Sequence, residues 1–173
     1  MRALLIAALL AAPAFAAEPQ GGPVFAGFGK HTPVEHNVAI PRGMVLRHVY
    51  DVTKAAPGKL NPGFETAARF INSHVANGMA ERDVAVAVVV HGPAIAELTK
   101  PEVYAARNPG TTNASEAMVK EMLARGVRFV VCGQAANAMG VKKADLLPGV
   151  ELAISASSAH AILQAQGYTL NPF

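Results

Sequence analysis

The sequence predicts an α/β protein with a three-layer α/β/α arrangement around a mainly parallel sheet of four to five strands. Short stretches rich in valine alternate along the chain with longer stretches whose apolar residues recur at helical spacing. Residues 83–91 are almost continuously apolar, which is typical of a strand covered on both faces. The chain has 173 residues, 51% of them hydrophobic and 16% charged, enough for one domain with a substantial core. This alternation predicts successive βαβ units.

The first sixteen residues resemble a bacterial export signal. Arg2 supplies a positive start, residues 3–12 are apolar, and Ala14-Phe15-Ala16 has the small-x-small pattern of a cleavage site. This apolar run is shorter than the roughly 20 residues that a membrane span needs, and an uncleaved anchor is the less favoured alternative. We therefore predict a signal peptide over residues 1–16, a periplasmic mature chain, and no membrane span after cleavage.

Residues 17–43 are predicted to form an irregular N-terminal arm, and residues 44–173 the α/β domain. Glycine and proline punctuate the arm every few positions, and Val24, Phe25 and Phe28 could hold it against the domain. His31 and His36 could form a metal pair, but no cysteine or carboxylate accompanies them at ligand spacing. Two solvated loop histidines are therefore the favoured interpretation, and no metal is expected.

The first half of the domain begins with a predicted strand over residues 44–52. Asn61 and Pro62 then form a typical helix start, with the asparagine as N-cap and the proline in the first turn. Phe64 begins the apolar face of this helix, and Gly78 ends it. The second predicted strand, residues 83–91, ends at His91.

The second half repeats the pattern. Asn113 is expected to open a helix through a capping box with Glu116, and Gly126 to end it. A strand over residues 127–132 follows, then a helix of small residues as far as Met139. Residues 150–155 form the last predicted strand. Ser157 or Ser158 could cap a final helix, in which His160 lies beside the apolar stripe and is interpreted as a boundary residue.

Composition and motifs exclude several classes of protein. The formal net charge is +3, or +2 once Arg2 is removed, and there is no run of basic residues and no tryptophan, so nucleic-acid binding is not expected. The phosphate-binding and catalytic patterns GxGxxG, GxxxxGK[ST], GxSxG and HExxH are all absent. The loop after the first strand lacks a run of Ser, Thr and Gly that could hold a flavin phosphate. No cofactor is therefore expected.

Cys132 is the single cysteine, so it cannot form an intramolecular disulfide. Free cysteine is among the most buried residue types, and composition alone favours an inert residue over a reactive one. The predicted position, between the end of a strand and the start of a helix, favours reactivity. There, open amide N–H groups and the helix dipole would stabilise a thiolate.

The carboxyl ends of parallel strands meet at one edge of a sheet, where ligands usually bind. Such an edge would collect Asp51, Ser155 and the candidate site residues. Cys132 is the candidate nucleophile and His91 the candidate base, because a thiol beside an imidazole is the minimum for an activated sulfur nucleophile. The candidate ligand-binding residues are Gly92, Asn113, Gly133 and Gln134.

These motifs resemble the DsrE/DsrF-like family over roughly residues 44–170. The resemblance is carried by His91-Gly92, Asn113, Leu123-Ala-Arg-Gly-Val127, Val131-Cys-Gly-Gln-Ala135, Asp145-Leu-Leu-Pro-Gly-Val150 and Gln164-x-x-Gly-Tyr168. It implies a flavodoxin-like fold and homo-oligomers, either trimers or hexamers. It also implies that the cysteine ending this strand, here Cys132, carries a persulfide.

The leading hypothesis is a periplasmic sulfur-handling protein that binds or relays sulfane sulfur on Cys132, and that could act as a sulfurtransferase. The amides of Gly133 and Gln134 would stabilise the thiolate, and His91 would accept a proton or shape the site. The partner would be a sulfur donor or acceptor protein, or a small sulfur compound. The alternative is a non-enzymatic module for small-ligand binding or oligomeric assembly, in which Cys132 is merely packed.

Overall fold

The computed structural model describes residues 17–170, so the predicted signal peptide lies outside the described residues. Its centre is a five-stranded sheet in the order β4-β3-β2-β1-β5, with every neighbouring pair parallel. The strands are β1 (Leu46–Val52), β2 (Val84–Val90), β3 (Arg128–Cys132), β4 (Glu151–Ala153) and β5 (Thr169–Leu170). This confirms the predicted α/β class and parallel sheet.

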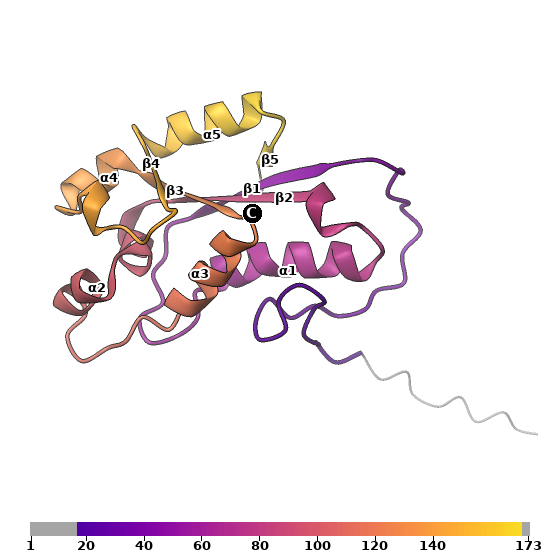
Figure 1. Ribbon diagram of the computed structural model, residues 1–173, viewed down its shortest axis with the longest axis horizontal. Coiled ribbons are helices and arrows are strands. Elements are labelled where there is room, and N and C mark those ends of the chain that lie inside the picture. Colours follow the sequence, from indigo (N-terminus) through magenta and orange to yellow (C-terminus); the bar gives the residue numbers. More distant parts are fainter. Residues whose placement is uncertain (1–16, 171–173) are drawn as a thin grey trace, which may run out of the picture.

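Helices cover the two faces of the sheet unequally (Figure 1). The α-helices are α1 (Pro62–Ala76), α2 (Pro101–Arg107), α3 (Glu116–Ala124), α4 (Gly133–Ala138) and α5 (Ala156–Ala165). Three 3-10 helices join them: η1 (Glu81–Asp83), η2 (Gly92–Leu98) and η3 (Lys143–Asp145). Helices α1 and α3 lie on one side of the sheet, and α5 lies alone on the other.

The strand order explains why α5 is alone. Strands β1 to β4 step across the sheet in one direction, and the chain then returns to pair β5 with the free side of β1. Right-handed crossovers in opposite directions place their helices on opposite faces of a sheet. The return from β4 to β5 therefore carries α5 over the face that α1 and α3 leave open.

The sheet separates a large core from a small one. The larger core includes Phe64 of α1 packed edge to face on Phe129 of β3, with ring centroids 5.3 Å apart. The smaller core, under α5, consists of Val49, Ala87, Val89, Val130, Ala159 and Leu163. Because successive strand residues point to opposite faces, β2 is buried on both sides, as its continuous apolar sequence predicts.

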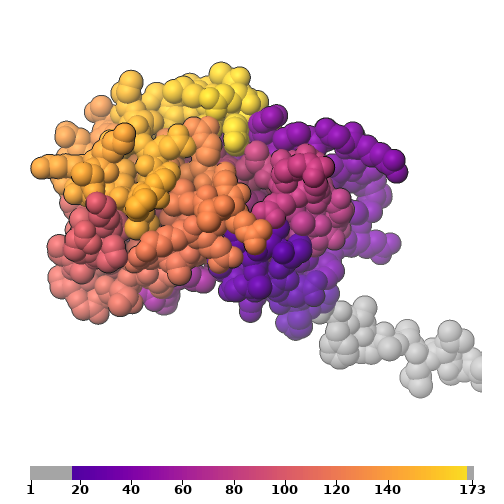
Figure 2. Space-filling view, in the orientation of Figure 1, coloured from indigo at the N-terminus to yellow at the C-terminus, as the bar shows by residue number. Residues whose placement is uncertain are grey.

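The N-terminal arm is packed against α1. Val24, Phe25 and Phe28 are buried in the larger core, and Gln20 and His31 form an isolated antiparallel bridge. Figure 2 shows the arm, in indigo, lying directly against the body of the molecule. The anchor is Asn72, which is fully buried in α1 and hydrogen-bonds to five backbone groups of the arm.

The predicted helix start at Asn61 is confirmed, since its side chain accepts a hydrogen bond of 2.9 Å from the Gly63 amide. The expected capping box at Asn113 is wrong. Helix α3 begins only at Glu116, because the Asn113 side chain accepts from the Ser115 amide and donates to the Glu97 carbonyl in a turn that precedes the helix.

The predicted start of the last helix is also wrong. Ser155 is the N-cap of α5, and it forms a capping box with Ser158. The strand expected over residues 150–155 therefore shortens to β4, because Ser155 already belongs to the helix start.

Candidate functional site

One row of residues marks the carboxyl edge of the sheet. Val52 pairs with Val90, Val90 with Val131, and Cys132 with Ala153. The next residues along these three strands are Thr53, His91 and Cys132, so the register places His91 between the other two. Cys132 follows Val130 by two residues, and Val130 packs under α5, so the thiol lies on the α5 face. The structure thus brings the two candidate catalytic residues to neighbouring positions.

Asp51 joins two histidines on this face. Its Oδ2 lies 2.8 Å from Nε2 of His91, and its Oδ1 lies 2.8 Å from Nε2 of His160. Thr53 Oγ1 also lies 3.3 Å from His91 Nε2. Asp51 comes from β1, His91 follows β2, and His160 belongs to α5, so three elements meet at one carboxylate.

The sequence interpretation missed His160 as a site residue. It lies 109 residues from Asp51, and beside an apolar stripe it has the pattern of a boundary residue. The one available signal was its place in a helix that starts at the carboxyl edge of the sheet. A polar residue in the first turns of such a helix is held close to the strand ends.

Two opposing effects act on the pKa of Asp51. Partial burial raises it, while hydrogen bonds from His160 and His91 and the charges of these rings lower it. Together the lowering effects outweigh the effect of burial, so the pKa of Asp51 lies below its ordinary value. The carboxylate is therefore ionised at neutral pH and is available to accept hydrogen bonds from both rings.

The Cys132 side chain is buried, with 7% of the residue exposed. The residue ends β3 and is the N-cap of α4, without a hydrogen bond from its own side chain to the helix. Within residues 17–170, the His91 ring makes its hydrogen bonds to Asp51 and Thr53 and none to the thiol. Cys132 and His91 are thus neighbours along the edge that are not hydrogen-bonded to each other.

Gly133 and Gln134 form the first turn of α4. A Cβ atom on Gly133 would lie 2.4 Å from the Ala153 carbonyl oxygen, so this turn is pressed against the backbone of β4. The Gln134 side chain is exposed. Of the predicted ligand-binding residues, these two adjoin the thiol through the backbone.

Gly92 and Asn113 have different surroundings. Gly92 follows His91 with a φ of 59°, a conformation that favours glycine, and so turns the chain sharply at the strand end. Asn113 is held by Glu97 and Ser115, in a polar network next to the start of α1. The structure therefore gives Asn113 a role in loop architecture and does not bring it to Cys132.

Glu97 is the buried acid of that network, and sequence reasoning did not single it out. Its carboxylate accepts hydrogen bonds from the Ala56 amide at 2.6 Å and from the Asn61 side chain. Burial raises the pKa of Glu97, against a smaller lowering by these two hydrogen bonds. With both carboxylate oxygens occupied, Glu97 serves to tie η2 to the loop after β1.

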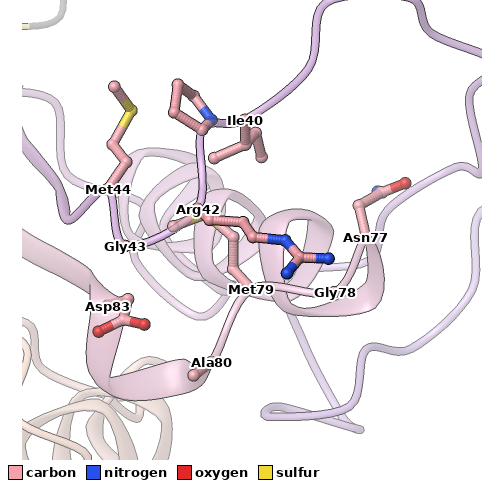
Figure 3. A pocket seen from close by; sticks show the side chains of 10 residues that line it. Ile40, Arg42, Gly43, Met44, Asn77, Gly78, Met79, Ala80 and Asp83 are labelled. Atoms are coloured by element: carbon pink, nitrogen blue, oxygen red, sulfur yellow. The ribbon is translucent and has the colours of Figure 1, made fainter.

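Free space lies at both ends of the sheet. A groove of about 540 Å³ at the carboxyl edge is lined by Asp51, by the residues of the following loop, and by Asn61, Pro62 and Gly63. Figure 3 shows a second groove, of about 300 Å³, between Arg42 and the loop from Asn77 to Asp83, next to the amino ends of β1 and β2. The first of these adjoins the Asp51–His91 pair.

Two kinds of feature are absent from residues 17–170. No cluster of three His, Cys, Asp or Glu residues in this range is arranged to hold a metal ion. None of its helices combines the length and the apolar character needed to cross a membrane.

The fold and its edge define a parallel α/β protein with a thiol at the carboxyl end of the central strands. The family model for the DsrE/DsrF-like family matches residues 50–172, which is more than half of the chain, and the protein belongs to that family. At the level of the family, this membership indicates sulfur relay. A search of curated proteins finds no match.

Two solved structures are similar to this chain. MTH1491, a protein of unknown function from Methanobacterium thermoautotrophicum, aligns with a TM-score of 0.50 and 24% identity, covering 73% of this chain and 97% of its own. YchN from E. coli aligns with a TM-score of 0.45 and 16% identity, covering 73% of this chain and 100% of its own. At this identity MTH1491 is informative about fold alone, which agrees with the predicted flavodoxin-like arrangement.

Proposed function

We propose that this protein accepts sulfane sulfur as a persulfide on Cys132 and passes it to an acceptor in the periplasm. The observation that carries the proposal is the position of Cys132, at the carboxyl edge of the sheet and next to His91 in register. Membership of a family associated with sulfur relay supports the same chemistry. The periplasmic location rests on the export-signal pattern of residues 1–16.

The transfer needs one nucleophile and one proton carrier. The Cys132 sulfur attacks the outer sulfur of a donor persulfide, forming a new S–S bond as the donor's own S–S bond breaks. The thiol proton passes to His91 and then to the departing donor thiolate. The products are a Cys132 persulfide and a donor thiol, with no net oxidation or reduction. The donor could be a protein persulfide or a small sulfur compound.

Replacing Cys132 by serine should abolish sulfur loading, because the hydroxyl oxygen cannot form the S–S bond of a persulfide. Purified wild-type and Cys132→Ser proteins would be incubated with polysulfide or thiosulfate and their intact masses measured with and without reductant. Wild type should gain the mass of one sulfur atom, reversibly, and the variant should gain nothing. A native wild-type protein whose thiol resists both sulfur loading and alkylation would contradict the proposal.

A second function, as an oligomeric assembly module, is favoured by apolar residues exposed at one edge of the sheet. Ile154, just after β4, is 81% exposed, and Ile162 of α5 is 53% exposed. A groove of about 260 Å³ between β4 and α5 is lined by Ile162 and by Ala153, the residue before Ile154. Covering such a patch with other copies of the chain would remove apolar surface from water. This supports the homo-oligomer, trimer or hexamer, expected from the family resemblance.

The assembly function is tested by placing a charge in this patch. Ile154→Lys should convert the oligomer to a smaller species in light scattering, because a buried lysine would lack a partner in an apolar interface. Val38→Lys is the matched control, since Val38 is 78% exposed on the distant arm and should leave the molar mass unchanged. A wild-type monomer would count against assembly and would leave the sulfur proposal unaffected.

A further inference from the structure

Two imidazole rings share the carboxylate of Asp51, and the two rings differ in exposure. His91 and His160 each place Nε2 at 2.8 Å from a separate oxygen of Asp51. The His91 side chain is 33% exposed, whereas that of His160, a residue of α5, is 14% exposed. The difference suggests that the two rings serve the carboxylate in different ways.

The surroundings of His160 favour one tautomer of its neutral ring. Its Nδ1 is buried and has no hydrogen-bond partner within the described part of the chain. A proton on that nitrogen would be a buried donor without an acceptor, which is costly and rare. In the neutral ring the proton therefore lies on Nε2, which donates to Asp51. His160 is a fixed donor that holds one oxygen of the carboxylate.

The same reasoning applies to the tautomer of His91. An ionised carboxylate can only accept, so Nε2 of His91, 2.8 Å from Oδ2, carries a proton. In the neutral ring, Nδ1 then has the free lone pair. No hydrogen bond among residues 17–170 occupies this nitrogen, and the ring lies next to Cys132 in register. Nδ1 is the ring nitrogen that can accept a proton.

We propose that Asp51 is the positioning residue of the sulfur-transfer site. It holds His91 in the Nε2–H form so that Nδ1 takes the Cys132 thiol proton, and His160 holds Asp51 in place. The inference rests on the proposed function and extends it by assigning roles to Asp51 and His160. The proton leaves the Cys132 sulfur as the new S–S bond forms, and it moves from Nδ1 to the donor thiolate as the donor's S–S bond breaks.

Two further charged groups of this face, Arg128 and Glu151, are paired with each other. Arg128 and Glu151 form a paired contact, with Nε and the second guanidinium nitrogen each 2.8 Å from a carboxylate oxygen. The titratable groups on the elements next to His91 include Asp51 of β1, Cys132 of β3 and His160 of α5, and Lys54 lines the same groove as Asp51. Glu151 also offers a control, because it is a second carboxylate on the same face.

The test compares Asp51→Asn, Asp51→Glu and Glu151→Gln with wild type. Each protein is loaded with polysulfide at about pH 5 to about pH 8, the range in which histidine normally changes charge. The initial rate of mass gain is measured, and the protonated nitrogen of each ring is read from ¹⁵N shifts. Asp51→Asn should slow loading by at least about 10-fold, since a positioned general base contributes on the order of 100-fold or more.

The expected signature is a change of tautomer together with the change in rate. The amide introduced by Asp51→Asn can accept from one ring but donates to the other, so one histidine must move its proton to Nδ1. Asp51→Glu restores a carboxylate and should recover part of the rate, and Glu151→Gln should load as wild type does. Circular dichroism confirms that each variant is folded, and Asp51→Glu still tests the idea if Asp51→Asn is not.

Either of two results would overturn the inference: wild-type loading rates in Asp51→Asn across the pH range, or a His91 protonated at Nδ1 in the neutral wild-type ring. Failure of the proposed function is distinguishable from both. If wild type takes up no sulfur, that function fails, while the ¹⁵N shifts and the rate of Cys132 alkylation by iodoacetamide still report whether Asp51 positions a base for the thiol.

Discussion

Replacing Asn72 by alanine should lower the free energy of unfolding by about 3 kcal/mol or more, since several buried polar groups would lose their partners at about 1–3 kcal/mol each. Asn72 is fully buried in α1. Its Oδ1 accepts from the Val24 and Phe25 amides at 3.2 and 2.9 Å. Its Nδ2 donates to the carbonyls of Phe25, Phe28 and Gly29 at 2.9 to 3.2 Å.

The expected loss is large because apolar burial depends on the same contacts. Val24, Phe25 and Phe28 occupy the larger core and are held there by the segment that Asn72 binds. If the arm detaches to hydrate its backbone, that apolar surface is exposed, at about 1.5–3 kcal/mol for each large side chain. Urea unfolding followed by circular dichroism measures the loss, and limited proteolysis should cut the arm first.

Two further variants sharpen this prediction. Asn77→Ala removes an exposed asparagine from the end of the same helix, where its side chain donates to the Ser73 carbonyl, and should cost less than about 1 kcal/mol. In Asn72→Asp, one carboxylate oxygen would face three carbonyls, which favours protonation and raises the pKa of the new group in the folded state. The folded state would then bind more protons, so stability should fall as pH rises from about 4. Equal losses in Asn72→Ala and Asn77→Ala would contradict the anchoring role.

The fold was predictable because its strongest signals are local. The continuous apolar run of β2 and the Asn61-Pro62 helix start depend on neighbouring residues, and both are confirmed. The wrong predictions concern residues whose hydrogen-bond partners lie far away in the sequence. Asn113 has the local pattern of a helix cap, yet it binds the Glu97 carbonyl, and α3 starts later. Nothing adjacent to Asn72 in sequence indicates that it binds a segment more than forty residues away.

In the candidate site, too, local signals were predictable and long-range contacts were not. The strand ends predicted that His91 and Cys132 share the carboxyl edge of a parallel sheet, but not that the two residues are neighbours, which depends on the pairing of β2 with β3. They could not predict that Asp51 bridges His91 to His160, because the path of α5 over the sheet depends on where β5 pairs. The sequence predicts which residues lie at the strand ends, but the contact between Asp51 and His160 depends on the order of the strands in the sheet.

Gly133→Ala should destabilise the fold by about 1–3 kcal/mol, the usual range for inserting a methyl group where there is no space. Its Cβ would lie 2.4 Å from the Ala153 oxygen and 3.1 Å from the Ile154 oxygen. Both obstacles are backbone atoms, so no side-chain rotation can relieve the contact. Either α4 must lift or β4 must move, and Cys132 is the residue that joins α4 to the sheet.

Gly27→Ala is the matched control, because a Cβ there meets nothing within 4 Å, and its stability should be close to that of wild type. Urea unfolding of both variants tests the packing, and the polysulfide loading rate tests the link to the site. If α4 positions the thiol, Gly133→Ala should load more slowly even under conditions in which it is fully folded. A destabilised variant that loads at the wild-type rate would show that the contact between α4 and β4 supports the fold alone, and that the reactivity of Cys132 depends on the strand edge and His91.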